Sequence, residues 1–498
     1  MSPASFSRRT EADRFADSVE AAVRDGGRFA GLVATARDDG STVLRALVAT
    51  PALVVIETIV GSGVNTYPAL TPLVPSAAWY EREIHDLFGI EPVGHRRLDP
   101  LVLPLGPHSA RPRPGGSSPA SAATLELDFA ALPGHVSGEG LFTIPYGPVR
   151  SGVFESVEYL VETSGEEIPH LRTRVYHKHR GLEQRFVDLD PSDAVLLAER
   201  VEGAASVAHA MAFSQAIETL AGVEAPRSAQ MVRVVHAELE RIAAHLDSII
   251  RHTEGAGQAV AYARMSLHKE RIMRLRALLC GHRFGRGVVV PGGVTGPLQL
   301  DPDDTLAEVG QIDRAIASDA KALMATPSFL DRLRGTGPLP AELALANGAL
   351  GPVGRGSGLV GDIRLQRPYG AYRFLGFEAA EGFVKGDALA RQWVRIEEIR
   401  QAFHLVRQGL DELSEGDAGP WQYDVTMTDG LALGWVEAPQ GELLYLVEAE
   451  GGRLVRVKPR CASFHNLALF AEAFRGDIFT DFVFIEASFG LSIAGVSG

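Results

Sequence analysis

Apolar residues recur with a helical period over several long stretches in the second half of the chain. The clearest stretch is 226–252, PRSAQMVRVVHAELERIAAHLDSIIRH, which starts with proline and places apolar residues at i, i+3, i+4 and i+7. Proline is favoured in the first turn of a helix, and this spacing gives the helix one apolar face. Similar patterns predict further helices over 257–282, 303–326 and 385–415.

The first hundred residues are patterned differently, because residues 15–60 alternate a short helical pattern with strand-like apolar runs. The stretch SAAWYEREIHDLFGI, 76–90, predicts a helix with Ser76 as its N-cap and Gly89 at its end. We therefore expect residues 1–103 to form one small α+β domain.

A segment rich in proline, glycine and serine, 104–140, follows this domain, and such a composition is typical of a semi-extended, mobile linker. Beyond it, residues 155–174 predict a short pair of strands. In the tail, 431–498, the runs ELLYLVEAE and DFVFIEASFG predict further strands. The predicted fold class is α+β, with a large, mainly helical second domain, 141–498, that carries small sheets.

The composition narrows the function. The 498 residues carry a formal net charge of −14, which argues against nucleic acid as a main partner, because binding to phosphates needs a basic face. The two cysteines, Cys280 and Cys461, are far apart and in no CxxC pattern. This excludes an iron–sulfur cluster of the usual four-thiolate kind and fits a reducing compartment. The N-terminus has no secretion signal and no apolar run is long enough to span a bilayer, so we expect a soluble cytoplasmic protein that could dock on a membrane complex.

The predicted helix 76–90 concentrates aromatic and charged side chains. One interpretation is a surface helix with ion pairs between residues four apart. The string WYEREIHDLFGI, followed by EPVGHRR, resembles the signature of the 30-kilodalton subunit of respiratory complex I. The residues that carry this resemblance are Trp79, Tyr80, Glu81, Arg82, Glu83, Asp86, Phe88 and Gly89, followed by Gly94, His95, Arg96 and Arg97.

Two further stretches could carry chemistry. YHKHRGLEQRF, 176–186, is either a solvated turn or a set of proton-active groups near a redox centre. The predicted helix 226–252 adds Glu238, Arg241 and His245, whose spacing places them on one face. That face is either a plain ion-paired surface or part of a network facing a partner subunit and its iron–sulfur cluster.

Both stretches resemble the 49-kilodalton subunit of complex I and the large subunits of nickel–iron hydrogenases, and GHRFGRGVVVPGGV at 281–294 extends the match. The resemblance implies a fusion of 30- and 49-kilodalton-type subunits, as in the formate hydrogenlyase and hydrogenase-4 branch. It implies partners: a small iron–sulfur subunit of the complex I 20-kilodalton type, a ferredoxin-like subunit and ion-translocating membrane subunits. It also implies a peripheral place on the inner face of the cell membrane.

Although the sequence resembles these hydrogenases, it lacks the cysteine ligands of their nickel–iron centre. The family's two pairs of cysteines fall here at Glu202 and Ala205, and roughly at Ser492 and Gly495, while a family arginine is replaced by Gln440. One carboxylate and no thiolates do not suit nickel and iron. The quinone anchors of complex I are also absent, since its tyrosine falls at Gly203 and the loop GPVRSGVFES has no histidine. Candidates for a substitute are His170, His177 and His179.

Two hypotheses follow. The first is an oxidoreductase subunit that binds no cofactor itself, receives electrons from clusters in its partners and passes them to a quinone or another acceptor. In this hypothesis Glu202 and His179 handle protons, and Arg180 and Arg200 stabilise negative charge. The second is a catalytically silent subunit that couples the peripheral arm to ion-translocating membrane subunits. A cavity lined by Glu202, Arg200 and Arg180 favours the first hypothesis, and one filled by Phe142 or Phe489 favours the second. A metal hydrolase would need a ligand cluster that the sequence does not offer.

Overall fold

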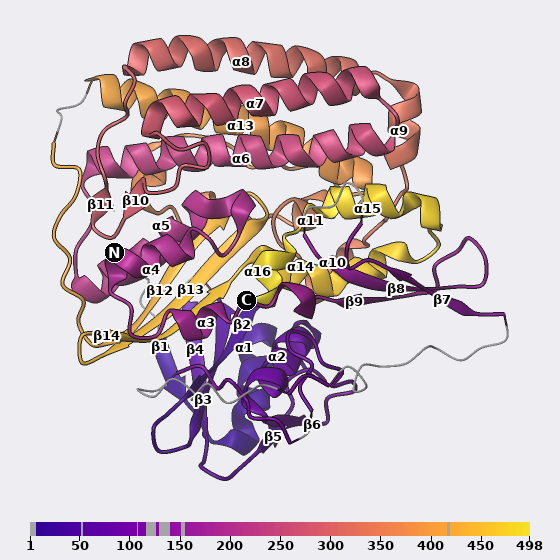
Figure 1. The fold of residues 1–498 in the computed structure, drawn as a ribbon, viewed down its shortest axis with the longest axis vertical. Helices are drawn as coiled ribbons and strands as arrows, with labels where there is room; N and C mark the ends of the chain where they lie inside the picture. The colour runs from indigo at the N-terminus through magenta and orange to yellow at the C-terminus, as the bar shows by residue number, and fades with distance from the viewer. Residues whose placement is uncertain are drawn as a thin grey trace.

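The computed structural model describes residues 6–50, 53–106, 108–115, 126–128, 140–150, 155–415 and 419–498. The chain builds three layers: an N-terminal sheet, a central three-stranded sheet with a helix across it, and a layer of long helices (Figure 1). This is the predicted α+β class.

The N-terminal layer is a four-stranded sheet in the order β1-β4-β3-β2, in which β1 runs parallel to β4 and the other neighbours are antiparallel. The predicted alternation of helix and strands over 15–60 is confirmed. The regular elements of this part are β1 (Phe6–Arg9), η1 (Ala12–Arg14), α1 (Phe15–Arg24), β2 (Arg28–Ala36), β3 (Thr42–Ala49), β4 (Leu53–Val60), β5 (Thr66–Pro68), η2 (Pro75–Ala77), α2 (Ala78–Phe88) and β6 (Glu91–Val93).

Helix α2 contains the signature string. It ends at Gly89, as predicted, and Gly89 has φ 70°, the left-handed conformation that glycine adopts without strain. The prediction of Ser76 as its cap was wrong, because a short 3-10 turn, η2, takes up Pro75–Ala77 and no side chain caps α2. The acidic residues of the signature bind backbone amides instead: Glu81 accepts from Leu70 and Thr71, and Asp86 from 101–103.

The second domain contains two antiparallel three-stranded sheets, β7-β8-β9 and β12-β13-β14. The predicted strand pair within 155–174 is confirmed as β8 and β9. The strands are β7 (Phe142–Tyr146), β8 (Glu158–Thr163), β9 (His170–Arg174), β10 (Val289–Val290), β11 (Gly293–Val294), β12 (Gly430–Ala438), β13 (Gly441–Glu450) and β14 (Arg453–Arg460).

Helix α5 crosses the face of the β12-β13-β14 sheet, and the close approach depends on Gly434, where a Cβ would lie 1.7 Å from the carbonyl oxygen of Ala212. The four long helices α6, α7, α8 and α13 pack together over this layer (Figure 1). The predicted helices are thereby confirmed. The longer helices are α5 (Ser206–Ala221), α6 (Arg227–Gly255), α7 (Ala259–Cys280), α8 (Pro302–Leu323) and α13 (Ala388–Glu415).

Shorter helices connect these elements. They are η4 (Tyr176–Lys178), α3 (Leu182–Arg185), α4 (Pro191–Ala198), η5 (Gly203–Ala205), α9 (Pro327–Leu333), α10 (Ala341–Ala346), α11 (Gly351–Gly356), α12 (Ile363–Gln366), η6 (Gly370–Phe374), α14 (Ala462–Phe470), η7 (Ala471–Phe474), η8 (Phe479–Asp481), α15 (Phe482–Phe489) and α16 (Ile493–Ser497). The prediction of a strand for DFVFIEASFG was wrong, because this run forms helix α15. Within the described ranges, no helix combines the length and the apolar character needed to cross a bilayer.

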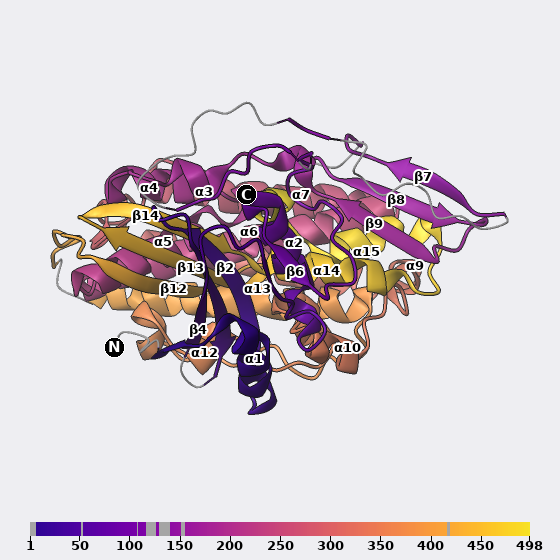
Figure 2. The same ribbon diagram turned by 90° about the horizontal axis from the view of Figure 1, so that it is seen from below.

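The N-terminal sheet packs against the β12-β13-β14 sheet, so that both of its faces are covered (Figure 2). Apolar residues of β2, β3 and β4 form one cluster with Leu433, Trp435, Leu444 and Leu446. Arg45, which is 4% exposed, makes two hydrogen bonds of 3.0 Å to Glu448. The two parts of the chain therefore share a core.

The signature helix lies at the same interface. Tyr80 forms a 3.0 Å hydrogen bond to His465 and packs against Phe464 with the two rings tilted by 55°. Lys458 of β14 donates to Glu83 of the signature at 2.6 Å and to Glu183 of the HRGLE string at 2.5 Å. Two motifs that are a hundred residues apart in the sequence thus share one buried ammonium group.

The predicted linker, 104–140, is only partly described. Residues 104–106 and 108–115 pack on the N-terminal domain, where the carbonyl of Pro114 accepts from Ala36 and the amide of Arg113 donates to Leu87. The prediction of a mobile segment was wrong for these residues, and most of 116–139 lies outside the described residues. The domain boundaries stay a prediction.

Candidate functional site

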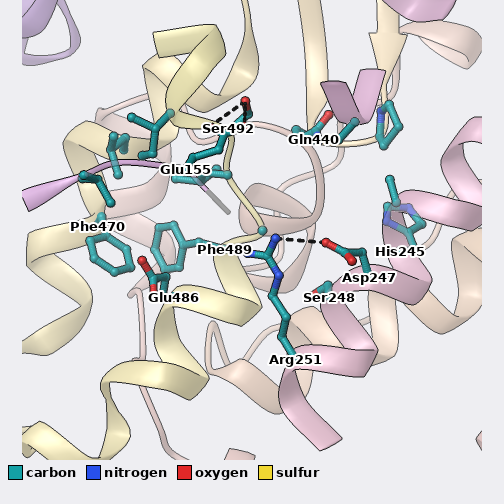
Figure 3. A pocket seen from close by; sticks show the side chains of 18 of the residues that line it. Glu155, His245, Asp247, Ser248, Arg251, Gln440, Phe470, Glu486, Phe489 and Ser492 are labelled. Carbon is teal, nitrogen blue, oxygen red and sulfur yellow. Dashed lines mark hydrogen bonds and ion pairs between the residues drawn. The ribbon is translucent and has the colours of Figure 1, made fainter. Parts of the chain in front are cut away.

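A cavity of about 100 Å³ lies where α6, α13, α14, the β12–β13 turn and the segment after α15 meet (Figure 3). One part of its wall is apolar and is formed mainly by Val157, Leu467, Phe470, Phe489 and Leu491. The polar residues in its wall are Glu155, Tyr159, His245, Asp247, Ser248, Arg251, Arg395, Gln440, Glu486 and Ser492. Two of these, Gln440 and Ser492, are positions where the sequence departs from the hydrogenase pattern.

The β12–β13 turn brings Gln440 to this cavity. Ala438 pairs with Gly441, so Pro439 and Gln440 form a two-residue connection between the strands. Gln440 is 8% exposed, and its Oε1 has no hydrogen-bond partner within the described part of the chain.

A buried ionic network of α6 and its neighbours holds this turn in place. Arg241 donates to the carbonyls of Glu437 and Ala438 at 2.7 and 3.1 Å, and its Nε lies 3.0 Å from Glu238. Glu238 also binds Arg364, and His245 is 2.7 Å from Glu398. The chain itself encloses the side chains of Glu238, Arg241 and His245, which are at most 2% exposed. Only His245 reaches the cavity, so a role toward a partner or its cluster stays a prediction.

Ser492 and Glu155 form one corner of the cavity. Ser492 donates from its hydroxyl to Glu155 at 3.0 Å, and the amide of Ala494 donates to the same carboxylate at 2.6 Å. Figure 3 shows the contact between these side chains. Glu155 thereby fixes the start of α16, which carries Gly495.

Glu202 lies behind this corner, next to the wall formed by Ala204. Its carboxyl is 1% exposed, and Oε1 has no partner within the described part of the chain. The pKa of Glu202 is raised to about 8, mainly by burial and in part by the charge of Glu155, while the charge of Arg180 opposes the rise. Glu202 is therefore a carboxylic acid, and not a carboxylate, at neutral pH.

His209 of α5 is the nearest titratable neighbour of Glu202, with Nε2 at 3.5 Å from Oε2. Burial lowers the pKa of His209 to about 3, so the contact joins a neutral acid and a neutral imidazole. The other ring nitrogen, Nδ1, lies 2.7 Å from the hydroxyl of Tyr445. Glu202, His209 and Tyr445 thus form a row of buried protonatable groups behind the cavity wall.

Cys461 also reaches this site, although it is distant in the sequence from the predicted ligand positions. A Cβ on Gly495 would meet Glu202 Oε2 at 2.7 Å and Cys461 Sγ at 3.0 Å, so the carboxyl and the thiol border the same glycine. Burial raises the pKa of Cys461 to about 12, and Glu202 contributes to the rise, so the sulfur is a thiol.

The remaining predicted catalytic residues surround Glu202 without lining the cavity. Arg180 donates to the carbonyls of Arg200, Val201 and Ala494 at 2.6–2.8 Å, so it clamps the segment before Glu202 to α16. His179 holds the carbonyl of Ser497 at 2.6 Å, and burial lowers its pKa. The side chain of Arg200 is half exposed and pairs with Glu199. Arg200 therefore takes part in this arrangement only through its carbonyl group, which accepts from Arg180.

The cavity formed by the described residues matches neither of the two anticipated from the sequence. The wall does not include Glu202, Arg180 or Arg200, and Phe142 is 53% exposed at another place. Phe489 does form part of the wall. The substitutes proposed for the quinone-facing histidine also lie elsewhere, since His177 is exposed beside Tyr176 and His170 lines a different cavity.

Sequence reasoning missed Glu155, His209, Tyr445 and Cys461. Glu155 belongs to the GPVRSGVFES string, and Cys461 is one of only two cysteines, so each carried a weak signal. His209 and Tyr445 are ordinary members of a helix and a strand, and only the packing of α5 on β13 brings them together.

Comparison with known proteins gives a consistent family. The family model of the respiratory-chain NADH dehydrogenase 30-kilodalton subunit matches residues 10–112, and that of the 49-kilodalton subunit matches 256–429 and 420–497. The model of nickel-dependent hydrogenases matches 180–248, which includes Glu202 and His209.

Curated relatives match over most of their length. The membrane-bound hydrogenase subunit alpha of Pyrococcus furiosus is 30% identical over 69% of this chain and 84% of its own. Formate hydrogenlyase subunit 5 of Escherichia coli is 28% identical over 83% and 74%, respectively. The C/D subunit of the NADH-quinone oxidoreductase of Acidiphilium cryptum is 27% identical over 86% and 80%.

The chain belongs to the family of fused complex I 30- and 49-kilodalton subunits and related large subunits of membrane-bound hydrogenases. The residues at its site do not fit the four thiolates that the nickel–iron centre of that family requires. Around these positions the chain offers one buried thiol, the carboxyl groups of Glu155 and Glu202 and the hydroxyl of Ser492, and the described residues contain no group of three His, Cys, Asp or Glu side chains that could hold a metal ion. Soft sulfur ligands are what such metals select.

Proposed function

We propose that this chain is the large subunit of a membrane-associated oxidoreductase complex that passes electrons to a quinone or another acceptor without nickel–iron chemistry. Its partners are a small iron–sulfur subunit of the complex I 20-kilodalton type, a ferredoxin-like subunit and ion-translocating membrane subunits. The iron–sulfur clusters belong to those partners, and the complex lies on the inner face of the cell membrane. Family membership and the names of the relatives support this assignment.

The observation that carries the proposal is the burial of the Glu202 carboxyl group, which is 1% exposed and whose Oε1 has no partner within the described residues. Reduction of a quinone to a quinol consumes two electrons and two protons, so an acceptor site needs a proton source as well as an electron source. An acid whose pKa is about 8 holds a proton at neutral pH and releases it readily, which is the property of a general acid. Glu155, which binds Ser492 in the cavity wall, is close enough for its charge to act on this acid.

The surface beside Glu202 supports the placement of an iron–sulfur partner. Gly203 and Ala204 are exposed although they directly follow a buried acid. Arg200 and Arg283 are about half exposed, and Phe284 is 41% exposed. Arg286, in the same loop as Arg283 and Phe284, lies 3.4 Å from the hydroxyl of Ser206, close to Gly203 and Ala204 in the sequence. An exposed backbone with arginine and aromatic side chains around it has the composition of a protein interface.

The alternative is a subunit that only couples its partners mechanically. The size of the cavity favours this alternative, because about 100 Å³ is small compared with the 300–1,000 Å³ of typical ligand pockets. Two phenylalanines, Phe470 and Phe489, form part of its wall. A redox role therefore requires that the cavity open in the complete complex.

The test is to purify the intact complex through a tag on this chain and to measure reoxidation of its reduced clusters by a quinone analogue. We expect iron without nickel, and a rate that falls about a hundredfold in Glu202→Gln, which is the contribution of a single general acid. Glu412→Gln, at a surface ion pair, serves as the control. A rate that does not depend on residue 202 assigns the chain to the coupling alternative, and stoichiometric nickel on this chain contradicts both.

A further inference from the structure

A second and larger cavity, of about 490 Å³, lies between the two domains and is not part of the site described above. Its wall combines the signature helix α2, the loop after β6, strand β9 and the segment around η7. The arginines in this wall are Arg82, Arg97, Arg172, Arg174 and Arg475. The carboxylates in it are Asp99 and Glu472.

Four of these arginines form ion pairs, and each pair joins residues from the same side of the cavity. Arg97 pairs with Asp99 on the N-terminal side, and Arg475 pairs with Glu472 at 2.6 Å on the other. Arg172 and Arg174 pair with Glu162 and Glu158 of the neighbouring strand β8. Cations from both domains therefore meet across one cavity, in a chain whose formal net charge is −14.

Arg82 is the most firmly placed of these cations. Its guanidinium donates to the carbonyls of Asp99 at 2.8 Å and Pro100 at 3.2 Å, and it stands 5.9 Å from the centre of the Trp79 ring. Both hydrogen bonds go to neutral carbonyl groups. The charges of Asp86 and Asp99 also act on Arg82, although neither carboxylate forms an ion pair with it within the described part of the chain, and burial lowers its pKa to about 10, so it stays a cation at neutral pH. Arg82 and Arg97 belong to the signature string and to the arginine pair after it, and the proposed redox function uses neither.

We infer that this interdomain cavity binds a small anion carrying phosphate groups, either a soluble organic phosphate or the phosphate of a lipid headgroup. Guanidinium groups bind phosphate oxygens with pairs of parallel hydrogen bonds, and several arginines around one concave site are the usual means of holding such an anion. The volume is that of a small-molecule pocket. A bound phosphate also bridges the two domains, because Arg82 and Arg97 lie on one side and Arg475 on the other.

The first arm of the test uses the full chain with pyrophosphate and is followed by isothermal calorimetry and by the thermal unfolding midpoint. We expect binding that weakens with added salt and that is about tenfold weaker in Arg475→Gln and in Arg97→Gln, since each removes a charge-assisted contact. These two side chains are 76% and 53% exposed, so the variants keep the fold. Arg274→Gln is the matched control, because Arg274 is 74% exposed and pairs with a glutamate of its own helix.

The second arm uses vesicles of phosphatidylcholine, alone or mixed with phosphatidylglycerol, in a flotation assay. Binding of pyrophosphate without binding of vesicles assigns the site to a soluble phosphate. Binding of only the phosphatidylglycerol vesicles, lost in the Arg97→Gln/Arg475→Gln double variant, assigns it to a lipid headgroup. If neither probe binds, or if both bind the double variant as well as the parent, the inference is wrong. An acidic protein segment would then be the remaining partner for these arginines.

Discussion

Glu202 is buried beside a neutral histidine, and the cost of ionising it there appears as a dependence of stability on pH. Suppose that an acid has a higher pKa in the folded chain than in the unfolded chain. At a pH between these two values, the acid is protonated in the folded chain and ionised in the unfolded chain. Unfolding therefore releases a proton in that window, and stability falls as the pH rises through it. For Glu202 the window runs from 4.5 to about 8.

We predict that Glu202→Gln, which carries no titrating proton, abolishes this contribution. The free energy of unfolding of the parent should fall relative to that of the variant by about 1.4 kcal/mol per pH unit within the window, and the difference should be constant above it. Urea denaturation of both proteins over this range measures it. Parallel stability curves would show that Glu202 is ionised in the folded chain.

A second prediction concerns Gly495, whose Cα borders both Glu202 and Cys461. Gly495→Ala places a methyl group 2.7 Å from Glu202 Oε2 and should destabilise the fold by about 1–3 kcal/mol, the cost of overpacking. Shortening Glu202 to alanine makes room, so the double variant should recover part of the loss. The family's thiolate falls at about this position, which means that Glu202 occupies the space that such a thiolate needs.

Gly203→Ala provides the control for this prediction. A methyl group added at Gly203 would meet nothing within 4 Å, and the residue is exposed, so its substitution should change the free energy of unfolding by less than about 0.5 kcal/mol. Additive losses in the Gly495→Ala/Glu202→Ala pair would show that the two residues do not compete for space.

At the scale of elements, periodicity predicted the helices α6, α7, α8 and α13, because each is long and carries its apolar residues at helical spacing. It failed for α15, whose run FVFIEASF is apolar on all sides; such a run carries no period, and length alone does not separate a short buried helix from a strand. The site was less predictable than the elements. Glu202 was identified from its place in a motif, whereas Cys461 and His209 reach it only through packing between elements that are distant in the sequence.

The signature helix α2 and the HRGLE string, which runs into α3, meet at strand β14. Lys458 lies between Glu83 and Glu183, Arg456 binds Glu183 at 2.6 Å, and all four side chains are buried. We predict that Lys458→Met destabilises the chain by about 3–5 kcal/mol, because it leaves two buried carboxylates with only one cation.

A double-mutant cycle measures this coupling. Lys458→Met combined with Glu83→Leu should cost less than the sum of the two single changes, since the second change removes the carboxylate that has lost its partner. The exposed pair Arg400–Glu397, broken by Arg400→Gln, should cost less than about 0.5 kcal/mol. If Lys458→Met and Arg400→Gln lowered the free energy of unfolding by the same amount, the buried bridge would stabilise the chain no more than the surface pair does.

At the scale of the whole molecule, composition predicted a linker and two domains but did not reveal how closely the domains are joined. The strands β2 and β3 are buried along nearly their whole length, because one face packs under α1 and α2 and the other on the β12-β13-β14 sheet. Strands covered on both faces lose the alternation of apolar and polar residues that would have identified them as surface strands. The same packing places the signature helix against Phe464 and His465, next to the segment that bears Cys461.

This shared core predicts that the two domains behave as one unit even when the chain between them is cut. A protease site inserted between residues 116 and 125 should allow complete cleavage, after which both fragments should elute together and unfold in a single thermal transition. The fragment 141–498 produced alone should aggregate, since it would expose Leu433, Trp435, Leu444 and Leu446 and leave Glu448 without Arg45. Fragments that separate after cleavage, or a second domain that stays monomeric and folded alone, would show that the interface is a weak contact between independent domains. Co-elution would instead make the N-terminal domain a permanent part of the site, because the bridge through Lys458 reaches the loop that carries His179 and Arg180.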